Sequence, residues 1–196
     1  MLGLSTREIL SDSNKEAFIP TVKFLKTRKP KYKFNGVKLW ERIHKGSMPE
    51  TWANPEINWE KYFDSYVQTY LERDVRDFSR IQDLLSFRKF MVAVAARTGQ
   101  LLNMADIARD VGIDQTTVKT WLSVLQASDL VYILEPFSLN VTKRIVKTPK
   151  IYFTDTGLAC FLCRWSSPES LMNGAMAGNI FETYVLGEIL KSYYNV

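Results

Sequence analysis

One stretch, residues 103–125, constrains the fold of this 196-residue chain more than any other part of its sequence. Its apolar residues fit a short helix, a tight turn at residues 111–113, and a second helix that begins after Asp114. Ala108 is small enough to lie where two helices cross, and Gly112 can take the positive φ that the turn requires. The pattern predicts a helix-turn-helix whose second helix turns four side chains inward: Val118, Trp121, Leu122 and Leu125.

Strand-like segments follow this motif. Residues 130–135 and 150–153 are rich in apolar and β-branched side chains, and a further strand is expected around 139–146. Asp155, directly after the last of them, is expected to cap a helix. Helices followed by a β-hairpin are typical of a winged helix. The sequence therefore predicts a fold that is mainly α with a small β-hairpin, a winged helix-turn-helix core flanked by helical segments.

Helical periodicity also flanks this core. We expect helices over residues 59–78 and 84–97, and amphipathic helical structure within residues 1–30. A last helix is expected over about 175–193. Its buried side is predicted to carry Ile180, Phe181, Tyr184, Val185, Ile189 and Leu190.

The positive charge of the chain is concentrated in one window. Lys and Arg number 26 against 21 Asp and Glu, a net charge of +5, but Lys23 to Lys45 alone carries nine basic residues and one acid. Lysines interleaved with aromatic residues can hold a nucleic-acid backbone. The alternative is a solvated connector whose aromatic residues pack on a neighbouring domain. The residues of this basic connector that we single out are Lys26, Arg28, Lys29, Lys31 and Lys33.

The helix-turn-helix suggests a DNA interface. In DNA-binding versions, the N-terminal half of the second helix faces base edges. The outward residues expected here are Gln115, Thr116, Lys119, Thr120 and Ser123, with Lys143, Arg144 and Lys147 on the wing. One lysine on the helix gives little charge for tight binding, so docking of a protein on the same surface stays open as an alternative.

Several classes of protein are disfavoured by what the sequence lacks. It contains no G-x-x-x-x-G-K-[ST] phosphate loop and only one histidine, His44, which disfavours a histidine-based triad or a multi-histidine metal site. Two cysteines, Cys160 and Cys163, cannot form a disulfide framework and are expected to be buried apolar residues, which indicates a cytoplasmic protein. No apolar stretch approaches the roughly 18 residues of a membrane span, so no membrane partner is expected.

Several motifs, in order, carry a family resemblance. They lie at residues 66–76, 96–100, 117–122, 143–144, 149–158 and 178–182. Together they closely resemble the C-terminal half of a large prokaryotic family of predicted AAA-type ATPases. In that family a P-loop ATPase domain is followed by a winged helix and a restriction-endonuclease-like domain of unknown function. The resemblance implies a helical ATPase tail and basic connector at 1–58, a winged-helix domain at 59–155 and the start of a truncated nuclease-like domain at 156–196.

The resemblance also implies what this chain does not do. The family's phosphate loop and metal-holding acid would precede Met1, so ATP and Mg²⁺ are expected in the family and no cofactor or metal in this chain. Glu182 matches the helix glutamate of the nuclease-like site, but the strands that would complete the site are absent before Val196. We expect a non-catalytic fragment that contacts DNA or relays nucleotide state to neighbouring domains. The alternatives are a dimerisation module, or an enzyme remnant in which Arg73 or Arg76 serves a neighbouring subunit's ATP.

Overall fold

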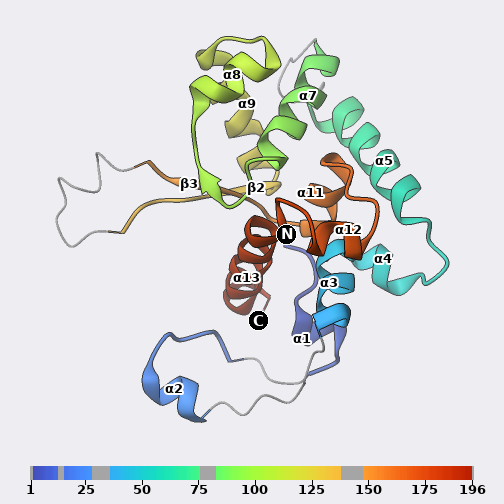
Figure 1. Ribbon diagram of the computed structural model, residues 1–196, viewed down its shortest axis with the longest axis vertical. Helices are drawn as coiled ribbons and strands as arrows, with labels where there is room; N and C mark the ends of the chain where they lie inside the picture. The colour runs from blue at the N-terminus through green and yellow to red at the C-terminus, as the bar shows by residue number, and fades with distance from the viewer. Residues whose placement is uncertain (1, 13–15, 28–35, 76–82, 138–147, 196) are drawn as a thin grey trace.

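The computed structural model describes residues 2–12, 16–27, 36–75, 83–137 and 148–195 (Figure 1). Most of these residues are helical, and the strands form one small antiparallel sheet, so the predicted fold class is confirmed. The elements are α1 (Thr6–Ile9), α2 (Val22–Thr27), α3 (Gly36–Lys45), α4 (Pro49–Ala53), α5 (Trp59–Thr69), the π-helix η1 (Tyr70–Val75), α7 (Leu84–Ala95), β1 (Gln100–Leu101), α8 (Met104–Val111), α9 (Gln115–Ala127), β2 (Val131–Leu134), β3 (Lys150–Phe153), α11 (Thr156–Leu162), α12 (Pro168–Met172) and α13 (Ala177–Tyr194).

The predicted helix-turn-helix forms from α8 and α9. Asn103 caps α8 by accepting hydrogen bonds from the backbone of Ala105 and Asp106. Gly112 then takes φ 82°, the left-handed conformation that few other residues tolerate. Asp114 caps α9, as the sequence predicts. The four side chains expected to face inward are all buried: Val118, Trp121, Leu122 and Leu125.

The sheet joins this motif to the segments before and after it. Its order is β1-β3-β2, with Gln100 opposite Ile151 and Val131 opposite Phe153. The strand expected at 139–146 lies outside the described residues. A helix, a short strand, the helix-turn-helix and the antiparallel pair β2–β3 thus follow one another, and we call this part the α7–β3 region. That it is a winged helix stays a prediction.

Aromatic side chains pack at the centre of the α7–β3 region. The indole ring of Trp121 on α9 lies edge-on to Phe87 and Phe90 of α7, with ring centroids 5.1 and 5.4 Å apart. Both phenylalanines are fully buried. Large aromatic rings at this spacing contribute packing energy beyond their apolar area. The contact fixes α9 against α7 and leaves the opposite side of α9 exposed.

One buried cluster runs through all three predicted segments. It includes Ile43 of α3, Phe87 of α7, Leu158 of α11 and Ile180 of α13. The α7–β3 region therefore packs on elements that precede it and follow it in the sequence. In Figure 1, α13 lies below the sheet, while α8 and α9 lie above it. Among the helices of the described ranges, none combines the length and hydropathy that a bilayer span requires.

The N-terminal residues differ from the amphipathic helix predicted within 1–30. Two short helices, α1 and α2, form there instead, and Ser5 caps α1 in a capping box with Glu8. Ser11 has φ 53° just after α1 ends, so the chain leaves the helical conformation there. The apolar residues that suggested a continuous helix are largely exposed: Ile19, Val22 and Leu25.

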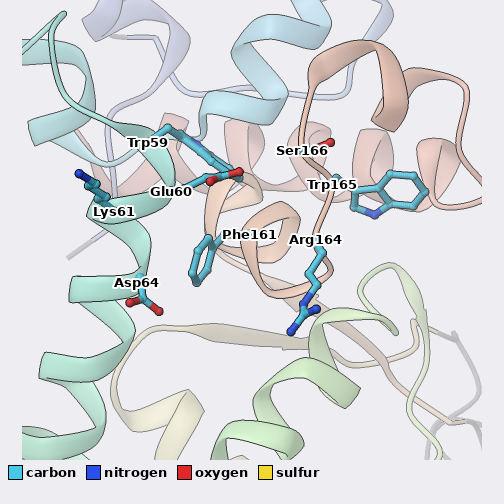
Figure 2. A pocket seen from close by; sticks show the side chains of 8 residues that line it. All are labelled: Trp59, Glu60, Lys61, Asp64, Phe161, Arg164, Trp165 and Ser166. Carbon is cyan, nitrogen blue, oxygen red and sulfur yellow. The ribbon is translucent and has the colours of Figure 1, made fainter.

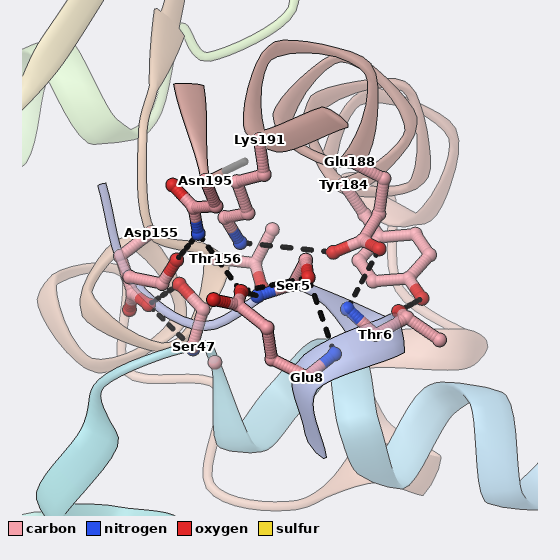
Figure 3. A network of polar contacts seen from close by, with 12 residues as sticks. Ser5, Thr6, Glu8, Ser47, Asp155, Thr156, Tyr184, Glu188, Lys191 and Asn195 are labelled. Carbon is pink, nitrogen blue, oxygen red and sulfur yellow. Dashed lines mark hydrogen bonds and ion pairs between the residues drawn. The ribbon is translucent and has the colours of Figure 1, made fainter. Parts of the chain in front are cut away.

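Helix α13 is also turned differently from the prediction. Phe181 and Val185, expected on the buried side, are 41% and 40% exposed, so that part of the prediction is wrong. Thr183 is buried instead, because its hydroxyl shares a hydrogen bond of 2.8 Å with that of Thr98. Figure 3 shows a second set of polar contacts, in which Thr6 donates its backbone N–H to Glu188 of α13 at 2.8 Å.

Candidate nucleic-acid interface

The five predicted recognition residues lie on one face of α9. All five side chains are exposed: Gln115, Thr116, Lys119, Thr120 and Ser123. Successive members are one or three residues apart, which places them on one side of a helix. They occupy the side opposite the buried Trp121 row. The structure therefore brings together the helix part of the predicted interface.

The hydroxyl groups of this face are partly used within the helix. Thr120 donates to the Thr116 carbonyl at 3.0 Å, and Ser123 donates to the Lys119 carbonyl at 2.9 Å. A hydroxyl that donates its proton still has oxygen lone pairs, so these two side chains can accept hydrogen bonds from a ligand. Within the five, Gln115 and Lys119 have the length to reach a groove and the donors to contact it.

Acidic residues border this face. Asp114 caps α9, and its hydrogen bonds with the hydroxyl and backbone N–H of Thr117 lower the pKa of its carboxyl. On α8, Asp106 pairs with Arg109 at 2.8 Å, and Asp110 pairs with Arg97. Acids exceed bases by one over residues 103–127, so the helix-turn-helix itself attracts phosphate weakly.

The remaining basic candidates cannot be placed beside α9. The wing residues Lys143, Arg144 and Lys147 lie outside the described residues, and so do Arg28, Lys29, Lys31 and Lys33 of the basic connector. Lys26 is exposed on α2, which Figure 1 shows apart from α9, at the opposite end of the molecule. The structure thus does not bring Lys26 and the recognition face together.

Glu182, the candidate nuclease residue, lies on α13 against the sheet. Its Oε1 accepts hydrogen bonds from Lys150 Nζ at 2.6 Å and from the Tyr152 hydroxyl at 2.5 Å. Burial acts to raise the pKa of Glu182, but the bonds from both partners and the Lys150 charge outweigh it, so the pKa is lowered. Burial and the nearby Glu182 carboxylate raise the pKa of Tyr152. The carboxylate therefore joins α13 to β3.

No metal cluster accompanies this carboxylate in the described part of the chain. There, no group of three or more His, Cys, Asp or Glu side chains is placed to hold a metal ion. Cys160 is fully buried and Cys163 half-buried, and burial raises the pKa of the Cys163 thiol to about 11. Their burial fits the apolar role expected of them.

Three of the motifs that carry the family resemblance, at 96–100, 149–158 and 178–182, meet around β3. Thr98, from the motif at 96–100, accepts the backbone N–H of Phe153 at 2.9 Å and shares a hydrogen bond with Thr183. Gly99 lies so close to Asn179 of α13 that an added Cβ would be 2.9 Å from the Asn179 carbonyl oxygen. These residues join α7, β3 and α13, which gives the motif residues packing roles.

Asp155 forms a second junction. Its side chain caps α11 through the Leu158 N–H at 2.7 Å, as predicted, and also accepts from the Ser47 N–H at 2.6 Å and hydroxyl at 2.7 Å (Figure 3). Thr156 beside it donates to the Ile43 carbonyl at 2.6 Å. The end of α3 is thereby fixed to the start of α11.

A surface hollow of ≈ 420 Å³ lies between α5 and the α11–α12 connection (Figure 2). Trp59 and Phe161 contribute aromatic walls, and Glu60 and Arg164 contribute charge of opposite sign. Trp59 stacks on His44 with centroids 4.4 Å apart, and burial lowers the pKa of His44 although its bond to the Trp165 carbonyl opposes this. Sequence reasoning missed this hollow, because its walls come from segments about 100 residues apart.

The fold and this face define a mainly helical protein with an exposed helix-turn-helix and a small sheet. The chain belongs to the family described as Domain of unknown function (DUF8612), which its residues 37–169 match. It is similar to "Uncharacterized protein Rv2008c" of Mycobacterium tuberculosis and "Uncharacterized protein Mb2031c" of Mycobacterium bovis, each 30% identical over 153 residues. The alignment covers 78% of this chain and 34% of each relative, so the chain spans about a third of their length. No solved structure matches it.

These comparisons name neither an ATPase nor a nuclease. The likeness to AAA-type ATPases, and the division into segments 1–58, 59–155 and 156–196, therefore stay predictions.

Proposed function

We propose that the chain is a non-catalytic binding module that contacts duplex DNA through α9. The observation that supports this is the row of five exposed polar side chains on the second helix of the helix-turn-helix. In a major groove, Gln115 is suited to adenine, and Lys119 to guanine or phosphate. Thr116, Thr120 and Ser123 add acceptors along the same face.

In this proposal the phosphate contacts come largely from the wing. Residues 103–127 carry one more acid than base, and affinity for DNA depends on how many phosphates a protein neutralises. Lys143, Arg144 and Lys147 lie in the sequence between β2 and β3. We propose that α9 contacts the base edges and that the wing contacts the phosphate backbone of the DNA.

We further propose that this module works within a longer cytoplasmic AAA-type ATP-binding protein and transmits nucleotide state between domains. The resemblance and the greater length of the mycobacterial relatives support this. Two junctions also support it, since Thr98–Thr183 couples the α7–β3 region to α13 and Ser47–Asp155 fixes the end of α3 to the start of α11. A movement of the elements before or after this region would be transmitted to α9 through the packed helices and the sheet.

The test is fluorescence anisotropy with a labelled 25-base-pair duplex pool between about 50 and 200 mM salt. We expect binding that weakens steeply as the salt concentration rises. Lys143→Ala should reduce the affinity, and it should reduce the slope of log affinity against log salt concentration by about one. Gln115→Ala should reduce preference among sequences. Lys61→Ala is the matched control, because Lys61 is an exposed lysine on α5, away from α9. Absence of binding at 50 mM salt removes DNA from the proposal.

A protein ligand on the same face is the second candidate. The acid excess around Asp106, Asp110 and Asp114 favours it, because acids repel phosphate but suit a basic protein surface. In the anisotropy experiment this candidate predicts no duplex binding at any salt concentration. Its own readout is a Gln115→Ala variant that loses binding to a separately purified ATPase half of a relative.

A further inference from the structure

Two opposite charges face the hollow between α5 and the α11–α12 connection without a partner in the described chain. Glu60 belongs to α5, and Arg164 follows directly after the C-cap residue of α11. No hydrogen bond or ion pair joins either side chain to another residue of the described ranges. Asp64, a second acid in the lining, is by contrast paired with Arg88 at 3.1 Å. The hollow therefore offers one unpaired carboxylate and one unpaired guanidinium to a ligand.

Aromatic rings separate these two charges. Figure 2 shows the Glu60 carboxylate beside the Trp59 ring and above that of Phe161. The Arg164 guanidinium lies below Phe161 in the same view, whereas Lys61 points away from it. The Trp59 and Phe161 rings meet edge to face, with centroids 6.0 Å apart, and a further ring can pack on such faces. The volume of ≈ 420 Å³ is in the range of small-molecule sites.

The backbone at Arg164 is in a conformation that glycine would adopt more easily. Its φ is 59°, and the Trp165 N–H that follows it bonds to the Cys160 carbonyl at 3.0 Å. This is the helix C-terminal motif whose left-handed position is usually a glycine. The other non-glycine residues at positive φ in the described ranges, Ser11 and Asp129, do not line the hollow. Strained backbone is concentrated at ligand-binding sites, so the strain at Arg164 favours a binding role for its side chain.

Hydrogen-bond donors in the walls are also unused. The indole N–H groups of Trp59 and Trp165 are buried and have no hydrogen-bond partner in the part of the chain that the structure describes. Buried N–H groups in native proteins are nearly always paired. The aromatic walls therefore have a hydrogen-bonding capacity that a ligand with acceptor oxygens, such as a carboxylate, can use.

We propose that this hollow binds a free amino acid with an aromatic side chain, in its zwitterionic form. The α-carboxylate pairs with Arg164, whose planar guanidinium suits it, and the α-ammonium pairs with Glu60. The ring packs on Trp59 and Phe161. A ligand with only one charge would leave the other protein charge without a partner in the complex. The zwitterion pairs both, so the site selects it over simple amines and simple carboxylates.

The first test compares three ligands that share one ring. They are L-phenylalanine, phenethylamine, which lacks the carboxylate, and 3-phenylpropionate, which lacks the ammonium. Each is titrated to about 10 mM into the ¹⁵N-labelled whole chain, and the indole N–H signals of Trp59 and Trp165 report binding by NMR. We expect saturable shifts with L-phenylalanine and binding of the other two that is weaker by about tenfold or more. Trp59→Phe and Trp165→Phe assign the two signals.

The second test removes each charge in turn. Arg164→Gly should weaken the binding of L-phenylalanine by about tenfold or more without weakening that of phenethylamine. Glu60→Gln should likewise weaken L-phenylalanine without weakening 3-phenylpropionate. Arg164→Gly should also raise the melting temperature of the free chain by roughly 2–4 °C, since glycine relieves the positive φ, which separates lost binding from misfolding. Arg109→Gln, at an arginine 72% exposed on α8, is the matched control and should leave binding unchanged.

Three outcomes overturn the proposal. The first is the absence of any shift with L-phenylalanine at about 10 mM. The second is equal binding of the three ligands, which would mean that the ring alone is recognised. The third is an equal effect of Arg164→Gly and Arg109→Gln. DNA enters none of these measurements, so the proposal stands or fails separately from the DNA interface.

Discussion

The ammonium group of Lys150 and the carboxylate of Glu182 meet at 2.6 Å across the junction of β3 and α13, and the Tyr152 hydroxyl bonds the same carboxylate oxygen. Both charged side chains remain partly exposed, at 38% and 46%. Solvent screens such a pair, so its contribution to stability is modest. Its structural effect is to fix α13 on the sheet.

We expect Glu182→Gln to lower the free energy of unfolding by about 0.5–1 kcal/mol, since the ion pair is lost while part of the hydrogen bonding remains. The measurement is urea unfolding in a double-mutant cycle with Lys150→Met. The expected coupling is under about 1 kcal/mol, and smaller at 0.5 M salt. A thermal stabilisation by Mn²⁺ in the wild type that disappears in Glu182→Gln would instead indicate a metal ligand.

Asp155→Ala should lower the free energy of unfolding by about 3 kcal/mol, much more than Glu182→Gln. The carboxylate is 4% exposed, and its removal leaves the Ser47 N–H, the Ser47 hydroxyl and the Leu158 N–H without their acceptor. Ser47→Ala removes only one of these three bonds and should lower the free energy of unfolding by about 1 kcal/mol. Chemical denaturation of both variants measures the difference. Equal effects of the two would contradict the shared-acceptor role of Asp155.

Two glycines should respond to alanine in opposite directions. At Gly157 a Cβ would lie 2.6 Å from the Lys45 carbonyl oxygen, a backbone atom that cannot move aside easily. Gly157→Ala should therefore destabilise by about 2 kcal/mol or more. Nothing lies within 4 Å of a Cβ at Gly178 in α13, so Gly178→Ala should be neutral or stabilise by up to about 1 kcal/mol. Thermal melts compare them, and a destabilised Gly178→Ala is the contrary outcome.

Stability should fall as the pH drops from 7.5 toward 5.5, in part through His44. Burial lowers the pKa of His44 below its usual 6.5, so the unfolded chain takes up a proton on this residue before the folded chain does. The stability it contributes is present above pH 6.5 and is lost as the pH falls through the folded pKa. His44→Gln should flatten this part of the profile in urea titrations. An unchanged slope in the variant would falsify the assignment to His44.

The helix-turn-helix could be predicted from the sequence because its determinants are local. Asn103, Gly112 and Asp114 act within a few residues of themselves, and the buried row of α9 follows helical spacing. The cap formed by Asp155 on α11 could be predicted for the same reason. Its bonds with Ser47 could not, because the two residues lie 108 positions apart.

The orientation of α13 escaped prediction for a different reason. Its apolar residues surround the helix, so periodicity does not select a buried side. The side turned to the sheet is set by Thr183, whose partner Thr98 is distant in sequence. The position of the recognition face on α9 could be predicted from helical spacing. The hollow beside Trp59 could not, because it forms only when the fold brings α5 and α11 together.

The amide of Asn195 donates to the Gly3 carbonyl at 2.9 Å, so residues near the two limits of the described chain are neighbours in space. A unit whose ends meet can be spliced into a host sequence at one point without stretching either connection. It can also be circularly permuted, with old ends joined by a short linker and new ends opened elsewhere. The ends close the longest loop in the chain, and they should therefore be the last part to assemble and the first to open.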